Sequence, residues 1–159
     1  RASVYYYIAS KEELFDEILR EVVGNTAALA KGIGSETGDP RTRLRRLIVT
    51  LMTAYADSYP LMYIYVRENL QQFAGRRASW GKHMRKLNRD VEEAVVAIVE
   101  AGYADRSFRN VGPARIVAYG ILGMLGWTHR WFHPAKSEVS AEQIADTYAA
   151  MVVSGLEAG

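Results

Sequence analysis

Apolar residues recur along most of the chain at the three- and four-residue spacing of helices with one buried face. A capping pattern, Ser10-Lys11-Glu12-Glu13, predicts the start of a helix that continues to about Gly32. Its apolar stripe consists of Leu14, Ile18, Leu19, Val22 and Val23. Asp39-Pro40 has the form of an N-cap followed by proline in the first turn, which predicts a second helix that ends before Pro60.

Glycines and prolines delimit four further segments of the same kind, residues 61–73, 77–100, 112–132 and 140–156. The segment 112–132 is apolar nearly all round, which indicates burial on more than one side. The last segment begins with a second capping pattern, Ser140-Ala141-Glu142-Gln143. The chain shows no strand alternation and no internal repeat. Six helices with short loops, preceded by a short helical segment, therefore predict an all-α bundle.

The composition fits one globular domain and excludes some kinds of site. The chain has 159 residues, of which 49% are hydrophobic and 24% charged, enough for a single core. The absence of cysteine excludes disulfides and thiolate metal sites. The net charge of +2 does not indicate nucleic acid by itself, and two basic clusters, at residues 41–46 and 76–89, are typical of solvated helix faces. No apolar run approaches the roughly 18 residues of a membrane span, and no signal peptide is visible, so we expect a cytoplasmic protein without a membrane partner.

The most specific pattern is Ser3-Val4-Tyr5-Tyr6-Tyr7-Ile8-Ala9-Ser10-Lys11-Glu12-Glu13-Leu14. It resembles the end of the DNA-binding head of TetR-family transcriptional regulators, where the recognition helix leads through a short turn into a Ser-Lys-Glu-Glu-Leu helix start. It departs from that pattern at Tyr7, where histidine is common, and at Ile8, where phenylalanine is common. The resemblance implies a TetR-like helical bundle. Residues 1–9 would be the remnant of the helix-turn-helix domain, and residues 10–159 the ligand-binding and dimerisation domain.

The resemblance also implies roles at the DNA. The matching family positions contact DNA, which makes Ser3, Tyr5, Tyr6 and Lys11 the DNA-binding candidates. Tyr5 and Lys11 would hold phosphates, because a tyrosine hydroxyl can donate to phosphate and a helix N-terminus favours anions; Ser3 and Tyr6 would approach base edges. The chain starts without methionine inside a predicted helix, so we expect residues upstream of Arg1 and no specific operator binding by this chain alone.

In TetR-like proteins the middle helices surround a ligand cavity. Residues 127–134, followed by a capped last helix, resemble a subgroup that senses acyl-CoA thioesters, so an acyl-CoA is the effector that the resemblance implies. The ligand-binding candidates are Tyr65, Phe73, Trp80, Met84, Gly123, Trp127 and Arg130. Plain core packing stays open as the alternative for the aromatic and methionine positions, because a stripe of that kind is typical of a core.

Two features of residues 112–132 bear on the ligand. Gly120, Gly123 and Gly126 are costly inside a helix, which indicates a close neighbour, either another helix or a ligand. Arg130 lies in an apolar segment and needs an anionic partner, which is either Glu68 or a phosphate or carboxylate of the ligand.

The last two predicted helices offer more apolar surface than one thin bundle can bury, which predicts a homodimer built on them. The interface candidates are Trp131, Tyr148, Met151 and Val152. The predicted function is that of a ligand-responsive transcriptional repressor, which binds operator DNA as a dimer and releases it when a small molecule binds.

Two other functions stay open, a TetR-like sensor of drugs or aromatic compounds and a helical interaction module without a ligand. An enzyme is not expected, because no nucleophile–base pair and no phosphate-binding glycine loop is visible. His129 and His133 are spaced to share a helix face, but Pro134 ends the helix there, so we expect no metal and no cofactor.

Overall fold

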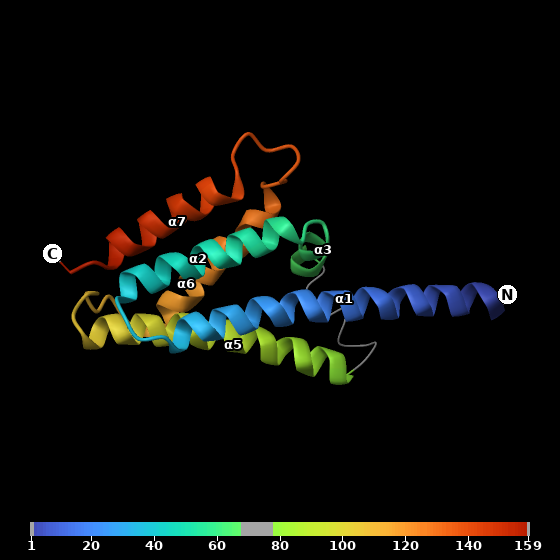
Figure 1. The fold of residues 1–159 in the computed structure, drawn as a ribbon, viewed down its shortest axis with the longest axis horizontal. Helices are drawn as coiled ribbons and strands as arrows, with labels where there is room; N and C mark the ends of the chain where they lie inside the picture. Colours follow the sequence, from blue (N-terminus) through green and yellow to red (C-terminus); the bar gives the residue numbers. More distant parts are fainter. Residues whose placement is uncertain (1, 68–77, 159) are drawn as a thin grey trace.

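The computed structural model describes residues 2–67 and 78–158, with side chains for residues 11–67 and 79–158. Helices form the regular structure of this part of the chain (Figure 1). The elements are α1 (Ala2–Ser35), α2 (Pro40–Asp57), α3 (Leu61–Arg67), α5 (Ala78–Ala104), α6 (Ala114–Trp127), the 3-10 turn η1 (Thr128–Arg130) and α7 (Ala141–Leu156). No strand occurs within these ranges. The predicted all-α fold is confirmed.

The helices form a layered bundle from which one end of α1 projects. Helix α1 lies alongside α5, and α2 lies alongside α7. Helix α6 packs against α5 and continues into η1 beside α3. The N-terminal turns of α1 extend beyond the other helices, at the opposite end of the molecule from the C-terminus (Figure 1). No helix in the described ranges is both long and apolar enough to cross a bilayer.

Two predicted helix starts are confirmed by their caps. The carboxylate of Asp39 accepts hydrogen bonds from the backbone N–H groups of Arg41 and Thr42, and Pro40 occupies the first turn of α2. The Ser140 hydroxyl accepts from the N–H of Gln143 at 3.2 Å, and the Gln143 side chain accepts from the N–H of Ser140 at 2.8 Å. Each cap satisfies backbone donors that the first turn of a helix leaves unpaired.

The helix start predicted at Ser10 is wrong, because α1 runs without interruption from Ala2 to Ser35. The segment around Ser10 contains no glycine or proline, and its lysine and glutamates are good helix formers. Backbone hydrogen bonds of a continuous helix can therefore replace the local cap. Lys11 consequently lies within a helix and not at its N-terminus, which removes the dipole argument for its binding a phosphate. The domain boundary after residue 9 stays a prediction.

Two other predicted boundaries differ from the structure. Helix α5 passes through Gly102 and ends at Ala104. Gly102 faces the ring of the buried Phe108, and a Cβ atom there would lie 2.1 Å from the ring atom Cδ2, so the glycine permits close packing and does not end the helix. The apolar segment after α6 is a 3-10 turn and a loop instead of the predicted helix to Phe132. The end of the third predicted helix, residues 68–73, lies outside the described residues.

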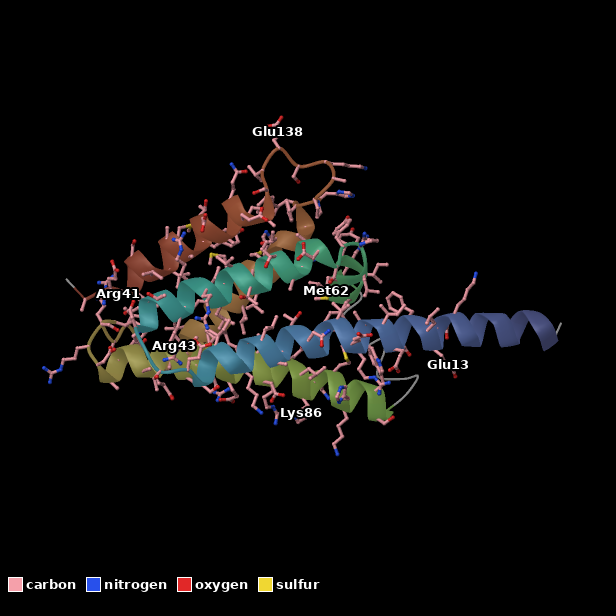
Figure 2. The ribbon with its side chains drawn as sticks, viewed as in Figure 1. Glu13, Arg41, Arg43, Met62, Lys86 and Glu138 are labelled. Carbon is pink, nitrogen blue, oxygen red and sulfur yellow. The ribbon has the colours of Figure 1, made fainter. Side chains whose placement is uncertain are left out.

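Three clusters of buried side chains hold the bundle together. The largest joins α1, α2, α5, α6 and α7, and includes Leu44, Leu47, Val95, Ile98 and Val99. A second joins α1, α3 and α5. A third joins α2 and α7 to Phe132, which follows η1. Met62 and Val66 of α3 pack against both smaller clusters; Figure 2 shows Met62 where α3 approaches α1. Helix α3 therefore packs both against α1 and α5 and against the cluster that α2 and α7 share.

Candidate functional site

A pocket of about 410 Å³ opens between α3 and the segment that follows α6. Its lining combines aromatic rings with basic side chains: Tyr59, Tyr63, Arg67, His129, Arg130, Trp131, Phe132 and His133. The volume falls in the range of small-molecule sites. No carboxylate occurs among the described lining residues, so the pocket favours an anion over a cation.

Aromatic rings hold both arginines of the pocket. Arg67 donates from Nη1 to the Tyr63 hydroxyl at 2.6 Å, and its Cζ lies 5.7 Å from the centre of the Tyr63 ring. The Cζ of Arg130 lies 4.5 Å from the centre of the Trp127 ring. Cation–π contacts of this kind orient a guanidinium without neutralising it. Neither arginine forms an ion pair with another described residue, so both keep N–H donors for a further partner.

The aromatic wall of the pocket continues into the core. The Tyr59 ring centre lies 5.6 Å from that of Tyr63 and 4.6 Å from that of His133. Behind it, Tyr55 contacts the rings of Tyr59 and Phe132. Tyr55 is 8% exposed, and its hydroxyl makes no hydrogen bond with the described residues. Burial, followed by the neighbouring tyrosines, raises the pKa of Tyr55 to about 12.

The predicted ligand residues fall into two groups. Arg130 lines the pocket, and Trp127, which is 60% exposed, stacks against it. Tyr65, Trp80 and Met84 instead pack into the buried cluster between α1, α3 and α5. Phe73 lies outside the described residues, and so does Glu68, the alternative partner of Arg130. The structure therefore does not bring Arg130 and Trp127 together with the other described aromatic candidates.

Polar contacts fix two of the buried aromatic candidates. Asn88 donates from Nδ2 to the Tyr65 hydroxyl at 2.9 Å, which links α5 to α3. The indole N–H of Trp80 donates to the backbone carbonyl of Asp16 at 3.3 Å, which links α5 to α1. Buried tyrosine and tryptophan commonly satisfy their polar atoms in this way. These contacts support the core alternative for Tyr65 and Trp80.

Among the described residues, the α6 glycines do not have the predicted close neighbour. A Cβ atom at Gly120, Gly123 or Gly126 would meet no atom within 4 Å. Large apolar side chains on the same helix are also exposed, with Ile116 at 65% and Tyr119 at 54%. This face of α6 therefore offers an open, partly apolar surface with little side-chain bulk at its glycines.

The predicted interface residues differ in their exposure. Trp131 is 49% exposed and Met151 is 61% exposed. Tyr148 and Val152 are half-buried, since both also pack against the large core cluster. The Thr128 hydroxyl lies 3.4 Å from that of Tyr148, which joins η1 to α7.

The remaining predictions concern charged and DNA-binding residues. Lys11 is exposed on α1, whereas the side chains of Ser3, Tyr5 and Tyr6 lie outside the described residues. The basic cluster on α5 is solvated where it is described, and Lys86 points away from the bundle (Figure 2). The cluster at residues 41–46 is an exception, because Arg43 is only 7% exposed.

Sequence reasoning missed Tyr59 and Arg67 as pocket residues. A signal was available, because Tyr59, Tyr63 and Arg67 follow one another at the four-residue spacing of a helix face, although α3 itself begins only at Leu61. The four-residue spacing of His129 and His133 suggested no role for them besides metal binding. In the described ranges, no group of three or more histidine or acidic side chains could hold a metal ion.

Comparison with known proteins identifies the family. Residues 37–156 match the family described as "Tetracyclin repressor-like, C-terminal domain". The chain belongs to the TetR family. The HTH-type transcriptional repressor KstR2 of Rhodococcus jostii strain RHA1 is 30% identical to this TetR-family chain over 155 residues, which cover 97% of this chain and 74% of KstR2.

Solved structures share the TetR fold. The ketosteroid transcriptional regulator KstR2 of Mycobacterium tuberculosis has a TM-score of 0.83 at 23% identity, and the match covers 99% of this chain and 79% of that one. AibR, in complex with isovaleryl coenzyme A and operator DNA, has a TM-score of 0.66 at 19% identity, covering 94% of this chain and 78% of AibR. The predicted class, a ligand-responsive repressor of the TetR type, is confirmed by the family match. The acyl-CoA effector stays a prediction.

Proposed function

We propose that this chain is the effector-sensing and dimer-forming body of a repressor that binds operator DNA as a homodimer and releases it when a small molecule binds. The observation that carries the proposal is the continuity of α1, which joins the motif at residues 3–14 to the core. Leu19, Val23 and Ala27 of α1 are buried against α3 and α5.

The continuity of α1 gives effector binding a route to the DNA. From Leu19 back to Ala2 the helix extends for about 26 Å at about 1.5 Å per residue. A small change in the packing around Leu19 would therefore displace the N-terminal end of α1 by a larger amount. In a dimer, that displacement would change the separation of the two recognition helices and thus the affinity for operator half-sites.

The proposed effector is an acyl-CoA-like molecule with an apolar part and an anionic part. Arg130 supports this, because it lines a pocket with aromatic walls and has no carboxylate partner among the described residues. AibR, which has the same fold, forms a complex with isovaleryl coenzyme A and operator DNA. The alternative is a sensor of flat aromatic drugs, for which the aromatic lining alone would suffice.

The proposed dimer uses α6 and α7. Ile116, Tyr119 and Trp127 expose apolar area on α6, and the neighbouring glycines allow a second helix to approach the backbone. The interface candidates Trp131, Tyr148, Met151 and Val152 extend the same proposal to η1 and α7. A lasting interface of this type buries more than roughly 2,000 Å² in total.

Ligand titration tests the effector. The melting temperature of the chain is measured with acyl-CoAs of increasing acyl length, with the matching free acids and with CoA alone. We expect acyl-CoAs to raise it most, because they engage both the apolar and the anionic part of the site. Stabilisation by flat aromatic drugs without any effect of acyl-CoAs would favour the drug sensor.

Operator binding tests the DNA roles in the full-length repressor. Tyr5→Phe and Lys11→Ala are expected to weaken binding to all sequences alike, because phosphate contacts position the protein without specifying bases. Lys11→Ala should also make binding less dependent on salt concentration. Exchange of the exposed Lys31 on the same helix for alanine is the control. Unchanged operator affinity in both variants would show that these residues have other roles.

A further inference from the structure

The pocket beside α3 holds two arginines that come from different elements. Arg67 ends α3, and Arg130 ends η1. Each guanidinium is placed by an aromatic ring, of Tyr63 and Trp127 respectively. A planar guanidinium held in this way presents its N–H donors in a fixed fork, which suits the oxygens of a carboxylate or phosphate.

Within the described ranges, Arg67 and Arg130 lack the carboxylate partner that several other arginines have. Arg45 pairs with Asp146, Arg46 with Glu36, and Arg115 with Glu92 and Glu93. No such pair neutralises Arg67 or Arg130 within the same ranges. Two positive charges that line one pocket repel each other. An anion bound between them would relieve this repulsion.

The rest of the lining sets the shape of the ligand. The rings of Tyr59 and His133 lie 4.6 Å apart between centres and are tilted at 56°, and Tyr63 continues the aromatic wall. A flat or apolar group can pack against these rings. The volume of about 410 Å³ is near the lower end of the small-molecule range, so the pocket suits a small organic anion or one end of a larger ligand.

We infer that this pocket binds an oxyanion, either a carboxylate or a phosphate, carried on a flat apolar group, with Arg67 and Arg130 donating to its oxygens. The inference deepens the proposed function. It rests on that function in one respect, namely that the bound anion is the effector or part of it. A free organic acid would supply the carboxylate, and a CoA-like molecule would supply the phosphate.

Three small probes test the site on the whole chain: benzoate, phenyl phosphate and benzyl alcohol, titrated by calorimetry and by tryptophan fluorescence, since Trp131 lines the pocket. At least one of the two anions is expected to bind about tenfold more tightly than the neutral alcohol. Binding of benzoate alone would identify a carboxylate site, and preference for phenyl phosphate a phosphate site. Equal affinity for all three probes, or no binding of either anion, would overturn the inference.

Substitutions test the two arginines. Arg67→Met and Arg130→Met are each expected to weaken anion binding about tenfold or more and to weaken benzyl alcohol binding much less. Arg67→Lys keeps the charge but not the fork and should give an intermediate loss. Arg85→Met, an exposed arginine on α5, is the matched control and should bind as the unaltered chain does. Full anion affinity in both methionine variants would assign the anion to another place.

The same variants separate this inference from the proposed effector. If acyl-CoAs still raise the melting temperature of the doubly substituted chain as much as that of the unaltered chain, the anion of this pocket is not part of the effector, and the effector proposal stands without it. If the anion probes bind the unaltered chain through both arginines and acyl-CoAs do not bind, the pocket inference stands and the acyl-CoA proposal is wrong.

Discussion

Arg43 of α2 donates from Nη2 to the backbone carbonyl of Gly34 at 2.6 Å, in the last turn of α1. Its Nε also donates to the carbonyl of Ile33 at 3.2 Å. The last carbonyls of a helix have no partner within the helix, and the helix dipole favours a cation there. At the same turn Gly34 faces Ala94 of α5, since a Cβ on Gly34 would lie 2.8 Å from the Ala94 Cα. Figure 2 shows Arg43 at this junction of three helices.

Arg43→Met is expected to lower the free energy of unfolding by about 2–4 kcal/mol, because it removes two charge-assisted hydrogen bonds and leaves buried carbonyls unpaired. Urea unfolding at neutral pH measures the change. Arg45→Met is the control, because Arg45 is exposed and pairs only with Asp146; a loss of no more than about 1 kcal/mol is expected there. Equal losses in the two variants would contradict the capping role.

The cap of α2 should make stability depend on pH in acid. The hydrogen bond from the Thr42 side chain is the largest factor that holds the pKa of Asp39 below its ordinary value. A lowered pKa means that the carboxylate stabilises the fold above the ordinary pKa of aspartate, and that this contribution is lost as pH falls through the lower, folded value.

Asp39→Ala is therefore expected to cost about 1 kcal/mol at neutral pH, with a cost that shrinks below about pH 4. Urea unfolding from pH 7 to pH 3 measures it. Asp39→Asn keeps a capping oxygen that does not titrate, so the difference between the asparagine and alanine variants should stay nearly constant over that range. A cost of Asp39→Ala that does not change with pH would argue against the charged cap.

Gly102→Ala is expected to destabilise the fold by about 1–3 kcal/mol through overpacking. The added Cβ would lie 2.1 Å from a ring atom of Phe108, which is buried and whose N–H donates to the Gly102 carbonyl at 2.9 Å. Gly32→Ala in α1 is the control, because a Cβ there meets nothing within 4 Å. That exchange should be neutral or stabilise by up to about 1 kcal/mol. Thermal unfolding of both variants decides between these outcomes.

Tyr55→Phe is expected to leave the free energy of unfolding unchanged or raise it by up to about 1 kcal/mol, because the buried hydroxyl has no hydrogen bond with the described residues. Tyr103→Phe is the control. Its hydroxyl donates to the Gly112 carbonyl at 3.0 Å, so its loss should cost about 1 kcal/mol.

The raised pKa of Tyr55 adds a second readout for the same variant. Since this pKa is about 12 in the fold and about 10 in the unfolded chain, its contribution to stability is complete below pH 10 and is lost as pH rises towards 12. Tyr55→Phe should therefore lose less stability than the unaltered chain between pH 9 and pH 11.5. An identical loss in both chains would contradict the burial of a neutral hydroxyl.

Ile116→Glu is expected to shift the chain from dimer to monomer in sedimentation at micromolar concentration, without reducing its helix content. The side chain is 65% exposed on α6, and a carboxylate there would lose its water in the proposed interface without a partner. Val111→Glu, at an exposed apolar residue that precedes α6, is the control and should leave the dimer intact. A monomer in the unaltered chain would contradict the dimer itself.

The sequence by itself determined the helical class, the family and two helix starts. The caps at Asp39 and Ser140 involve atoms within three residues of each other, so the local sequence contains the whole interaction. The apolar spacing likewise predicted helices with one buried face, because a helix places residues three and four apart on one side.

Tertiary structure decided the features that depend on distant segments. Ser10 has the same type of capping pattern as Ser140, yet α1 continues through it, since the pattern permits a helix start without requiring one. Gly102 lies inside α5, where the ring of Phe108 packs over it. Arg67 and Arg130 line one pocket although they come from different elements. Arg43 is buried, unlike the solvated arginines near it in the sequence, and caps the end of α1. In each case the partner lies on another element, and only the packing of the helices brings the two together.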